Sequence, residues 1–325
     1  MKRILIIFTG GTISMSFDND SNKSVINDNH NELLDKIKSR FSDDALFDSY
    51  VFSMVPSPSF TPNDMFKLGK LIDEKLENQG YDGVVITHGT DTLEETAYFL
   101  DVFLQTKKPV VLTGSMRNFD ELGYDGFSNL LSAILVVLSD QSYNRGVLVC
   151  LNDEINAANE VQKSHTVALD TFKSLEFGPI GLVDEKTVIY YRLSGYQSIK
   201  VHPSVLNKRI EIIKVTAGTN SSLIDYYINE SVDGLVIEGL GRGNVPALMV
   251  AGIKRAISSG ITVVITSRCP MGRVRDTYAY EGGGYHLKTL GVLSGGDLTS
   301  EKARLKLMLI LSANLYPNNY FSFNF

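Results

Sequence analysis

Residues 4–13 have the sequence Ile-Leu-Ile-Ile-Phe-Thr-Gly-Gly-Thr-Ile, and residues 83–92 have the sequence Gly-Val-Val-Ile-Thr-His-Gly-Thr-Asp-Thr. Each stretch is a short apolar run that ends in glycines and hydroxyl-bearing side chains. Runs of this kind are typical of buried strands in a parallel sheet. Because ligands bind at the carboxyl ends of such strands, we expect both motifs to lie beside one cleft.

The chain around these stretches alternates short strands with longer segments of helical period. Further strands are predicted at 110–113 and 146–151. Helix starts are predicted at Thr61-Pro62, for a helix that runs to Gln79-Gly80, and at a capping box formed by Thr92-Leu93-Glu94-Glu95, for a helix through Leu104. A third helix is predicted over 127–138. This alternation predicts an α/β fold with a parallel sheet and helices on both faces.

The length of 325 residues favours two domains, because single cores usually stop growing near ~250 residues. We predict a larger N-terminal domain over 1–190, a linker over 191–209 and a smaller C-terminal α/β domain over 210–325. The second domain repeats the scheme, with strands at 234–237 and 262–266 and helices at 247–258 and 300–311.

The composition excludes several classes of protein. The chain is 43% hydrophobic and 21% charged, as soluble globular proteins are, and its net charge of -6 disfavours nucleic-acid binding. The apolar run after Met1 is too short for a signal peptide, and no run approaches the ~18 residues that cross a bilayer. We therefore expect a cytoplasmic protein that acts on a small molecule.

Cysteines and histidines give no sign of a metal site. Cys150 and Cys269 lack a neighbouring thiol and are expected to be buried free thiols. His88 adjoins the second motif and is expected to pack there or to donate a hydrogen bond. None of the histidines has metal-ligand spacing, and we expect neither metal nor cofactor: His30, His88, His165, His202 and His286.

The two motifs and the segment Gly114-Ser115-Met116-Arg117 carry groups suited to acyl transfer. Gly10 and Gly11 permit tight backbone geometry and leave amide N–H groups free to face an oxyanion. A threonine hydroxyl needs a base or a polarising network before it attacks, and Thr90-Asp91 supplies a hydroxyl beside a carboxylate. Taken singly, each pattern is also compatible with a simple turn. The nucleotide-binding glycine patterns and the Gly-x-Ser-x-Gly elbow are absent from the sequence.

Together the motifs resemble those of the L-asparaginase family, and the resemblance extends over nearly the whole chain. Its segments are Thr9 to Ile13, His88 to Thr92, Leu112 to Arg117, Asp125-Gly126, Lys163 to His165, Phe172 to Ser174, Gly241 to Asn244 and Ser267 to Gly272.

The resemblance implies a role for each matching residue. Thr12 would be the nucleophile that attacks the side-chain amide and forms an acyl-enzyme, and Thr90, Asp91 and Lys163 would form a second catalytic set. Asp91 would also bind the substrate's α-ammonium group, and Ser57 its α-carboxylate. The remaining substrate-binding residues would be Ser115, Glu281 and Asn244, the last from a neighbouring protomer, which implies a homo-oligomer, a dimer or a dimer of dimers.

Two segments depart from the family's pattern. Many members carry a tyrosine in the loop after the first motif, whereas Ser14 to Asn31, predicted as a mobile loop, has Phe17 as its only aromatic residue. The segment Arg273 to Glu281 aligns poorly where many members place a glutamate. Tyr280 and Glu281 are the candidates there.

The sequence thus predicts an amidohydrolase that converts L-asparagine to L-aspartate and ammonia, with glutamine as a weaker substrate. Two alternatives remain open at this point. One is an ammonia-supplying component of an amidotransferase, although such components carry an extra N-terminal domain and the first motif here begins nine residues into the chain. The other is a sensor that binds asparagine or aspartate without turnover.

Overall fold

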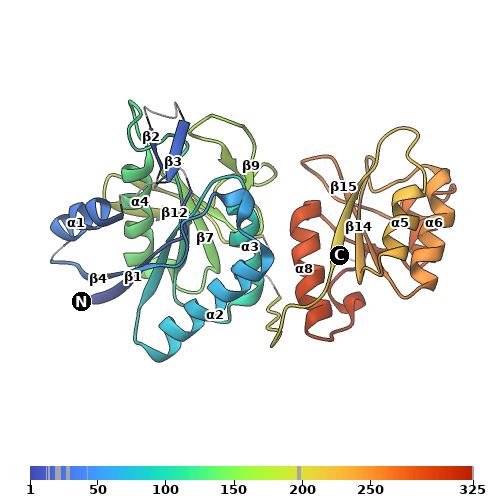
Figure 1. The fold of residues 1–325 in the computed structure, drawn as a ribbon, viewed down its shortest axis with the longest axis horizontal. Coiled ribbons are helices and arrows are strands. Elements are labelled where there is room, and N and C mark those ends of the chain that lie inside the picture. Colours follow the sequence, from blue (N-terminus) through green and yellow to red (C-terminus); the bar gives the residue numbers. More distant parts are fainter. Residues whose placement is uncertain are drawn as a thin grey trace. The chain divides into compact units, whose positions relative to one another are not determined.

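The computed structural model forms two compact units, Met1–Lys200 and Val201–Phe325. It describes residues 1–11, 13, 15–18, 23–26, 30–41, 43–195 and 199–323. The predicted α/β class, with a larger first domain and a smaller second one, is confirmed (Figure 1). The predicted domain boundaries stay a prediction, and the two units divide within the segment expected to be the linker.

The first unit is built on an eight-stranded sheet with the order β12-β11-β8-β7-β6-β5-β1-β4. The strands from β4 to β7 are parallel, whereas β8, β11 and β12 pair antiparallel. The bounds are β1 (Lys2–Phe8), β4 (Ala45–Val51), β5 (Gly83–Thr87), β6 (Val110–Thr113), β7 (Val147–Leu151), β8 (Glu154–Ala157), β11 (Gly181–Asp184) and β12 (Thr187–Tyr190).

The sheet is therefore mixed. The predicted parallel pairing is present from β4 to β7, and antiparallel pairing replaces it at the other edge. Asn152 and Asp153 join β7 to β8 with φ values of 51° and 61°. Two consecutive residues with positive φ form the tight turn that suits a hairpin, and Asn and Asp tolerate this conformation. The signal was present in the sequence as Asn152-Asp153.

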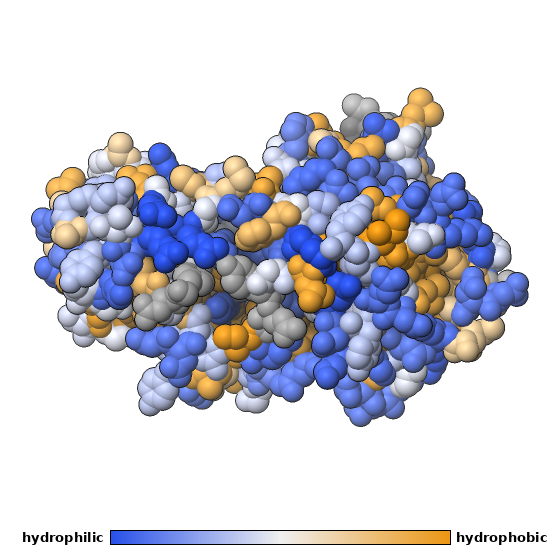
Figure 2. All heavy atoms as spheres, turned by 180° about the vertical axis from the view of Figure 1, so that it is seen from behind, coloured by the Kyte–Doolittle hydropathy of each residue, from blue (hydrophilic) through white to orange (hydrophobic). Residues whose placement is uncertain are grey.

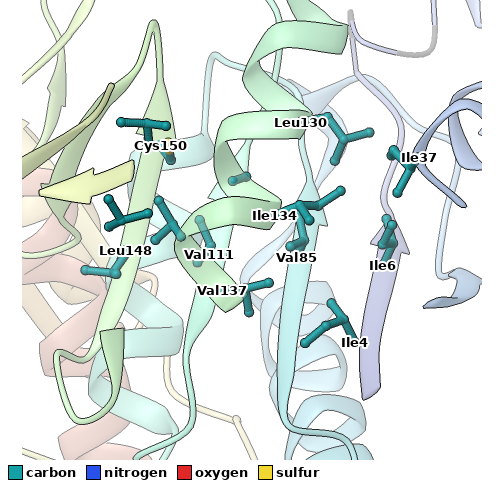
Figure 3. Close-up of a cluster of buried hydrophobic side chains, with 14 of the residues drawn as sticks. Ile4, Ile6, Ile37, Val85, Val111, Leu130, Ile134, Val137, Leu148 and Cys150 are labelled. Carbon is teal, nitrogen blue, oxygen red and sulfur yellow. The ribbon is translucent and has the colours of Figure 1, made fainter. Parts of the chain in front are cut away.

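Helices cover both faces of the parallel part of the sheet (Figure 1). Ile134 and Val137 of α4 (Gly126–Leu138) belong to one hydrophobic cluster with Ile6, Val85 and Val111 of neighbouring strands, and Figure 3 shows Ile134 and Val137 beside Val85. Helices α2 (Pro62–Asn78) and α3 (Leu93–Phe103) pack on the opposite face, and α1 (His30–Arg40) adjoins β4. This packing holds the parallel strands in place, and with them the loops that follow their carboxyl ends.

The second unit has a parallel sheet with the order β13-β14-β15-β16. Helix α8 packs on β13, β14 and β15, while α5, α6 and α7 contribute to the core on the other side (Figure 1). The bounds are β13 (Ile210–Lys214), β14 (Gly234–Gly239), β15 (Thr262–Ser267), β16 (Leu293–Ser294), α5 (Ser222–Asn229), α6 (Ala247–Ser258), α7 (Gly284–Thr289) and α8 (Ser300–Ser312).

Shorter elements complete the chain. Residues 15–18 and 23–26, predicted as part of a loop, form the antiparallel strands β2 (Met15–Asp18) and β3 (Lys23–Ile26), while the rest of that loop before His30 lies outside the described residues. The other short elements are η2 (Ser57–Ser59), η3 (Asp140–Ser142), η4 (Pro317–Asn319), β9 (Gln162–Lys163) and β10 (Phe172–Lys173).

The two predicted caps have different outcomes. At α2 the capping box is present, because the Asp64 amide donates to the Thr61 hydroxyl and the Thr61 amide donates to the Asp64 carboxylate. At α3 the predicted box is wrong. The Thr92 hydroxyl donates instead to the carbonyl oxygen of Ser57 at 2.9 Å, so a tertiary partner has replaced the local one.

The face of the molecule drawn in Figure 2 is mainly hydrophilic. In the view of Figure 2, hydrophobic side chains occur in small groups between charged and polar ones. Of the two cysteines, Cys150 is buried as expected, whereas Cys269 is exposed, because it lies in the loop after β15. Within the described residues, no helix is both long enough and apolar enough to cross a membrane.

Candidate active site

Lys163 joins the hydroxyl and the carboxylate of the second motif. Thr90 and Asp91 follow β5, and Lys163 lies on β9. The Lys163 ammonium donates to Thr90 Oγ1 at 2.9 Å and to Asp91 Oδ1 at 2.7 Å. The structure thus brings together residues that lie far apart in sequence, as the two hydrogen bonds span 73 and 72 residues.

Burial differs across this cluster in a way that suits proton transfer. Thr90 is buried, the Lys163 side chain is 16% exposed and the Asp91 side chain is 61% exposed. The ammonium therefore lies between a buried hydroxyl and a carboxylate in contact with water. A proton-bearing group in hydrogen-bond contact with both a hydroxyl and a carboxylate is suited to passing protons between them.

Gly11 of the first motif allows close contact with the second motif. Gly10 and Gly11 have φ values of 98° and 84°, in the left-handed region that favours glycine. A Cβ atom at Gly11 would clash with the backbone of Gly89. The two loops therefore lie side by side, as the positions of β1 and β5 in the sheet predict.

Ser57 is also brought to this place. Its hydroxyl oxygen accepts a hydrogen bond from the Asp91 amide at 3.1 Å, and its side chain adjoins Gly89. Ser57 is buried at the start of η2. The 3-10 turn thus places the Ser57 hydroxyl next to the backbone of the Thr90-Asp91 segment.

The third loop lies against the second as well. A Cβ atom at Gly114 would lie 2.5 Å from the carbonyl oxygen of His88 and 3.4 Å from Thr90 Cγ2. Ser115 is buried, and its hydroxyl donates to the carbonyl oxygen of Arg117 at 2.8 Å. The Asp125 carboxylate accepts the amides of Met116 and Arg117, which fixes the course of this loop.

His88 supports the second motif from the protein interior. It is fully buried and makes an edge contact with Phe60 at 4.8 Å between ring centroids. Its Nδ1 lies 2.8 Å from the Gly89 carbonyl oxygen and its Nε2 lies 3.1 Å from the Thr96 hydroxyl. Burial lowers the pKa of His88 to about 4, so the ring is neutral at pH 7 and acts both in packing and as a hydrogen-bond donor.

Tyr124 is a residue near the first motif that sequence reasoning missed. Its hydroxyl donates to the carbonyl oxygen of Ile13 at 2.9 Å, and its ring packs beside Phe119 at 5.2 Å between centroids. The contact spans 111 residues, so no local pattern reveals it. Thr12, the expected nucleophile, lies outside the described residues.

Asn244 and Glu281 belong to the second unit, where they lie near each other. The Gly284 amide donates to Asn244 Oδ1 at 3.3 Å, and the Val245 amide donates to the carbonyl oxygen of Gly282 at 2.9 Å. Glu281 and its neighbour Tyr280 are exposed. These contacts hold the loop after β14 against the turn before α7.

Comparison with known families identifies the chain. A model described as asparaginase, N-terminal matches residues 3–194, and a model described as glutaminase/asparaginase C-terminal domain matches residues 209–320. The chain belongs to the asparaginase family. It is therefore an enzyme of the class that hydrolyses amides.

Individual relatives agree with this membership over most of their length. An L-asparaginase of Bacillus licheniformis is 35% identical over 96% of each chain. The crystal structure of a probable cytoplasmic L-asparaginase from Campylobacter jejuni has a TM-score of 0.86 and 30% identity over 98% of each chain. A component of the glutamyl-tRNA(Gln) amidotransferase of Methanosarcina barkeri is 33% identical over 96% of this chain and 74% of that protein.

Proposed function

We propose that this asparaginase-family enzyme hydrolyses L-asparagine to L-aspartate and ammonia, with L-glutamine as a weaker substrate. The observation that carries the proposal is the Lys163 ammonium held between Thr90 Oγ1 and Asp91 Oδ1. Relatives named L-asparaginase that match nearly the whole chain support the choice of substrate.

In the proposed reaction, the Thr12 hydroxyl attacks the side-chain amide carbon of asparagine. The Thr12 oxygen–carbon bond forms, the carbon–nitrogen bond breaks, and the amide nitrogen leaves as ammonia after taking up a proton. Water then attacks the resulting ester, which releases aspartate and returns the proton to Thr12. Thr90, Lys163 and Asp91 would move protons during these steps, and backbone N–H groups near Gly10 and Gly11 would stabilise the oxyanion.

The same cluster would also hold the substrate's amino-acid end. The Asp91 carboxylate, which faces solvent on its exposed side, would pair with the α-ammonium group. The Ser57 hydroxyl, which accepts a hydrogen bond from the Asp91 amide, would bind the substrate's α-carboxylate. Ser115 would line the site from the third loop, and Asn244 with Glu281 would complete it.

We further propose that the protein is a cytoplasmic homo-oligomer, a dimer or a tetramer, in which Asn244 serves the site of a neighbouring protomer. The name of the Campylobacter jejuni relative supports the compartment. The loop contacts that hold Asn244 beside Gly284 support a fixed presentation of its side chain.

A second candidate function is supply of ammonia to a glutamyl-tRNA amidotransferase. The 33% identity to a component of the Methanosarcina barkeri amidotransferase supports it. In that case the protein would copurify with a large partner, and the partner would be needed for full release of ammonia.

The test is ammonia release from L-asparagine and L-glutamine by the purified protein and by Thr12→Ala. We expect release from asparagine by the wild type and a loss of at least ~100-fold in the variant, because removal of a catalytic nucleophile can lower kcat by about a million-fold. Calorimetric binding of asparagine that leaves it intact over hours would contradict the proposal and favour the sensor.

A further inference from the structure

Glu94 contacts Lys163, the lysine of the candidate site, at its backbone amide, whereas the second motif contacts the side-chain ammonium. It lies in the first turn of α3, three positions after Asp91. Its Oε2 accepts a hydrogen bond from the backbone amide of Lys163 at 2.5 Å. Lys163 is thus held at its amide by Glu94 and at its ammonium by Thr90 and Asp91.

The amide of Lys163 faces away from the strand that pairs with β9. In the pairing of β9 with β10, Lys163 lies opposite Phe172, and the amide of Ser164 donates to the carbonyl oxygen of Thr171. Successive amides of a strand point to opposite sides. The Lys163 amide therefore points outward from this two-stranded pair, and its acceptor there is the Glu94 carboxylate.

This bond restricts where the ammonium can go. A lysine has a flexible four-carbon stem, so its Nζ position is set only when its Cα is also fixed. A carboxylate acceptor makes a hydrogen bond roughly twice as strong as a neutral one, and the negative charge suits the N-terminal turn of a helix. Thr90 and Asp91 lie just before the start of α3, and Glu94 lies in its first turn. The N-terminal end of this helix therefore positions both the backbone amide and the ammonium of Lys163.

We propose that Glu94 is a positioning residue that fixes the backbone of Lys163 so that its ammonium reaches both Thr90 and Asp91. The inference rests on the proposed function, in which Lys163 moves protons. Glu94 does not touch the substrate in this account, and it acts through Lys163.

A purely structural role makes a different prediction. Glu94 and Glu95 both lie in the acidic first turn of α3, where either charge stabilises the helix. If helix stability were the whole role, Glu94→Asp would behave like the wild type, and Glu94→Ala would match Glu95→Ala. A positioning role requires that the acceptor reach the Lys163 amide, which aspartate does not because it is one methylene shorter.

The experiment compares kcat and KM for asparagine in Glu94→Ala, Glu94→Asp and Glu94→Gln, with Glu95→Ala as the matched control. We expect Glu94→Ala and Glu94→Asp to lower kcat by about 10- to 100-fold, the scale of a displaced catalytic group, with a smaller change in KM. Glu94→Gln retains a carbonyl oxygen and should restore most of kcat. Glu95→Ala should stay within about twofold of the wild type.

Hydrogen exchange of the Lys163 amide, followed by NMR in protein labelled with ¹⁵N-lysine, gives a readout that does not depend on activity. Protection in the wild type and in Glu94→Gln, with loss in Glu94→Ala and Glu94→Asp, is the expected result. Equal protection in all four proteins, or an unchanged kcat in Glu94→Asp, would overturn the inference. A wild type that releases no ammonia would refute the proposed function, while the exchange pattern would still decide whether Glu94 holds Lys163.

Discussion

At the scale of single residues, His88 links burial to pH. Its ring makes an edge contact with Phe60 and is hydrogen-bonded to Gly89 and Thr96. Burial lowers the pKa of His88 to about 4 from the ordinary value of 6.5. The unfolded chain therefore binds a proton below pH 6.5 that the folded chain does not bind until about pH 4. Stability should fall as pH decreases through this window and be fully present above pH 6.5.

We expect His88→Gln to flatten this dependence. One proton corresponds to a slope of up to about 1.4 kcal/mol per pH unit, and the variant has no group that titrates at this position. Urea unfolding of both proteins between about pH 4.5 and 7.5 measures the difference in slope across the interval where the histidine should titrate. Parallel stability curves for the two proteins would show that His88 does not titrate on unfolding.

Tyr124 gives a second prediction at this scale. Tyr124→Phe removes the hydroxyl that donates to the Ile13 carbonyl, next to the proposed nucleophile, and keeps the ring. A neutral hydrogen bond contributes about 0.5–1.5 kcal/mol, so we expect kcat to fall about 2- to 10-fold. Steady-state kinetics test this, and Tyr143→Phe, at an exposed tyrosine, is the control. Unchanged kcat in Tyr124→Phe would contradict a role in holding this segment.

At the scale of elements, local signals predicted the strands and helices better than their partners. β6 has the predicted bounds, since it is a β-branched run closed by turn residues. The capping box at α3 failed because Thr92 bonds to Ser57 across 35 residues. Contacts of this range, including those of Tyr124 and Glu94, depend on the packing of whole elements and leave no local pattern.

The same limit applies to the candidate site. The second motif itself pointed to Thr90 and Asp91, whereas Lys163 was found through the resemblance to the family. The structure places their side chains in contact. Spacing alone would not have selected Lys163, because it lies in a polar stretch where a solvated lysine is the usual case. The proposed roles of all these residues remain predictions.

The close contact between the loop after β1 and the loop after β5 leads to a prediction about Gly11. Gly11→Ala combines a left-handed backbone, which costs about 1–2 kcal/mol for other residues, with a clash against the Gly89 backbone. We expect a loss of activity of at least ~10-fold and a lower melting temperature, because the two loops can no longer approach as closely. Gly80→Ala is the matched control, because Gly80 also has a positive φ of 72° while a Cβ there meets open space among the described residues. Equal effects of both changes would show that the contact with Gly89 is unimportant.

At the scale of the whole molecule, each unit has buried hydrophobic residues of its own. The proposed catalytic threonines belong to the first unit and Asn244 to the second. If Asn244 completes the site of a neighbouring protomer, the two kinds of residue can be supplied by different chains.

A mixing experiment tests this arrangement. Thr12→Ala and Asn244→Ala should each be nearly inactive. When equal amounts are dissociated and reassembled together, half of the random dimers carry one intact site of two, so about a quarter of wild-type activity should return. Activity that stays at the level of the separate variants would place Asn244 in the site of its own chain or outside any site.

The two cysteines also differ in a useful way. Burial raises the pKa of the Cys150 thiol, which keeps it unreactive, whereas Cys269 is exposed in the loop after β15. The chain contains no tryptophan. A maleimide dye should therefore attach at Cys269 alone, on the second unit, and any emission attributable to tryptophan in a complex would come from the partner.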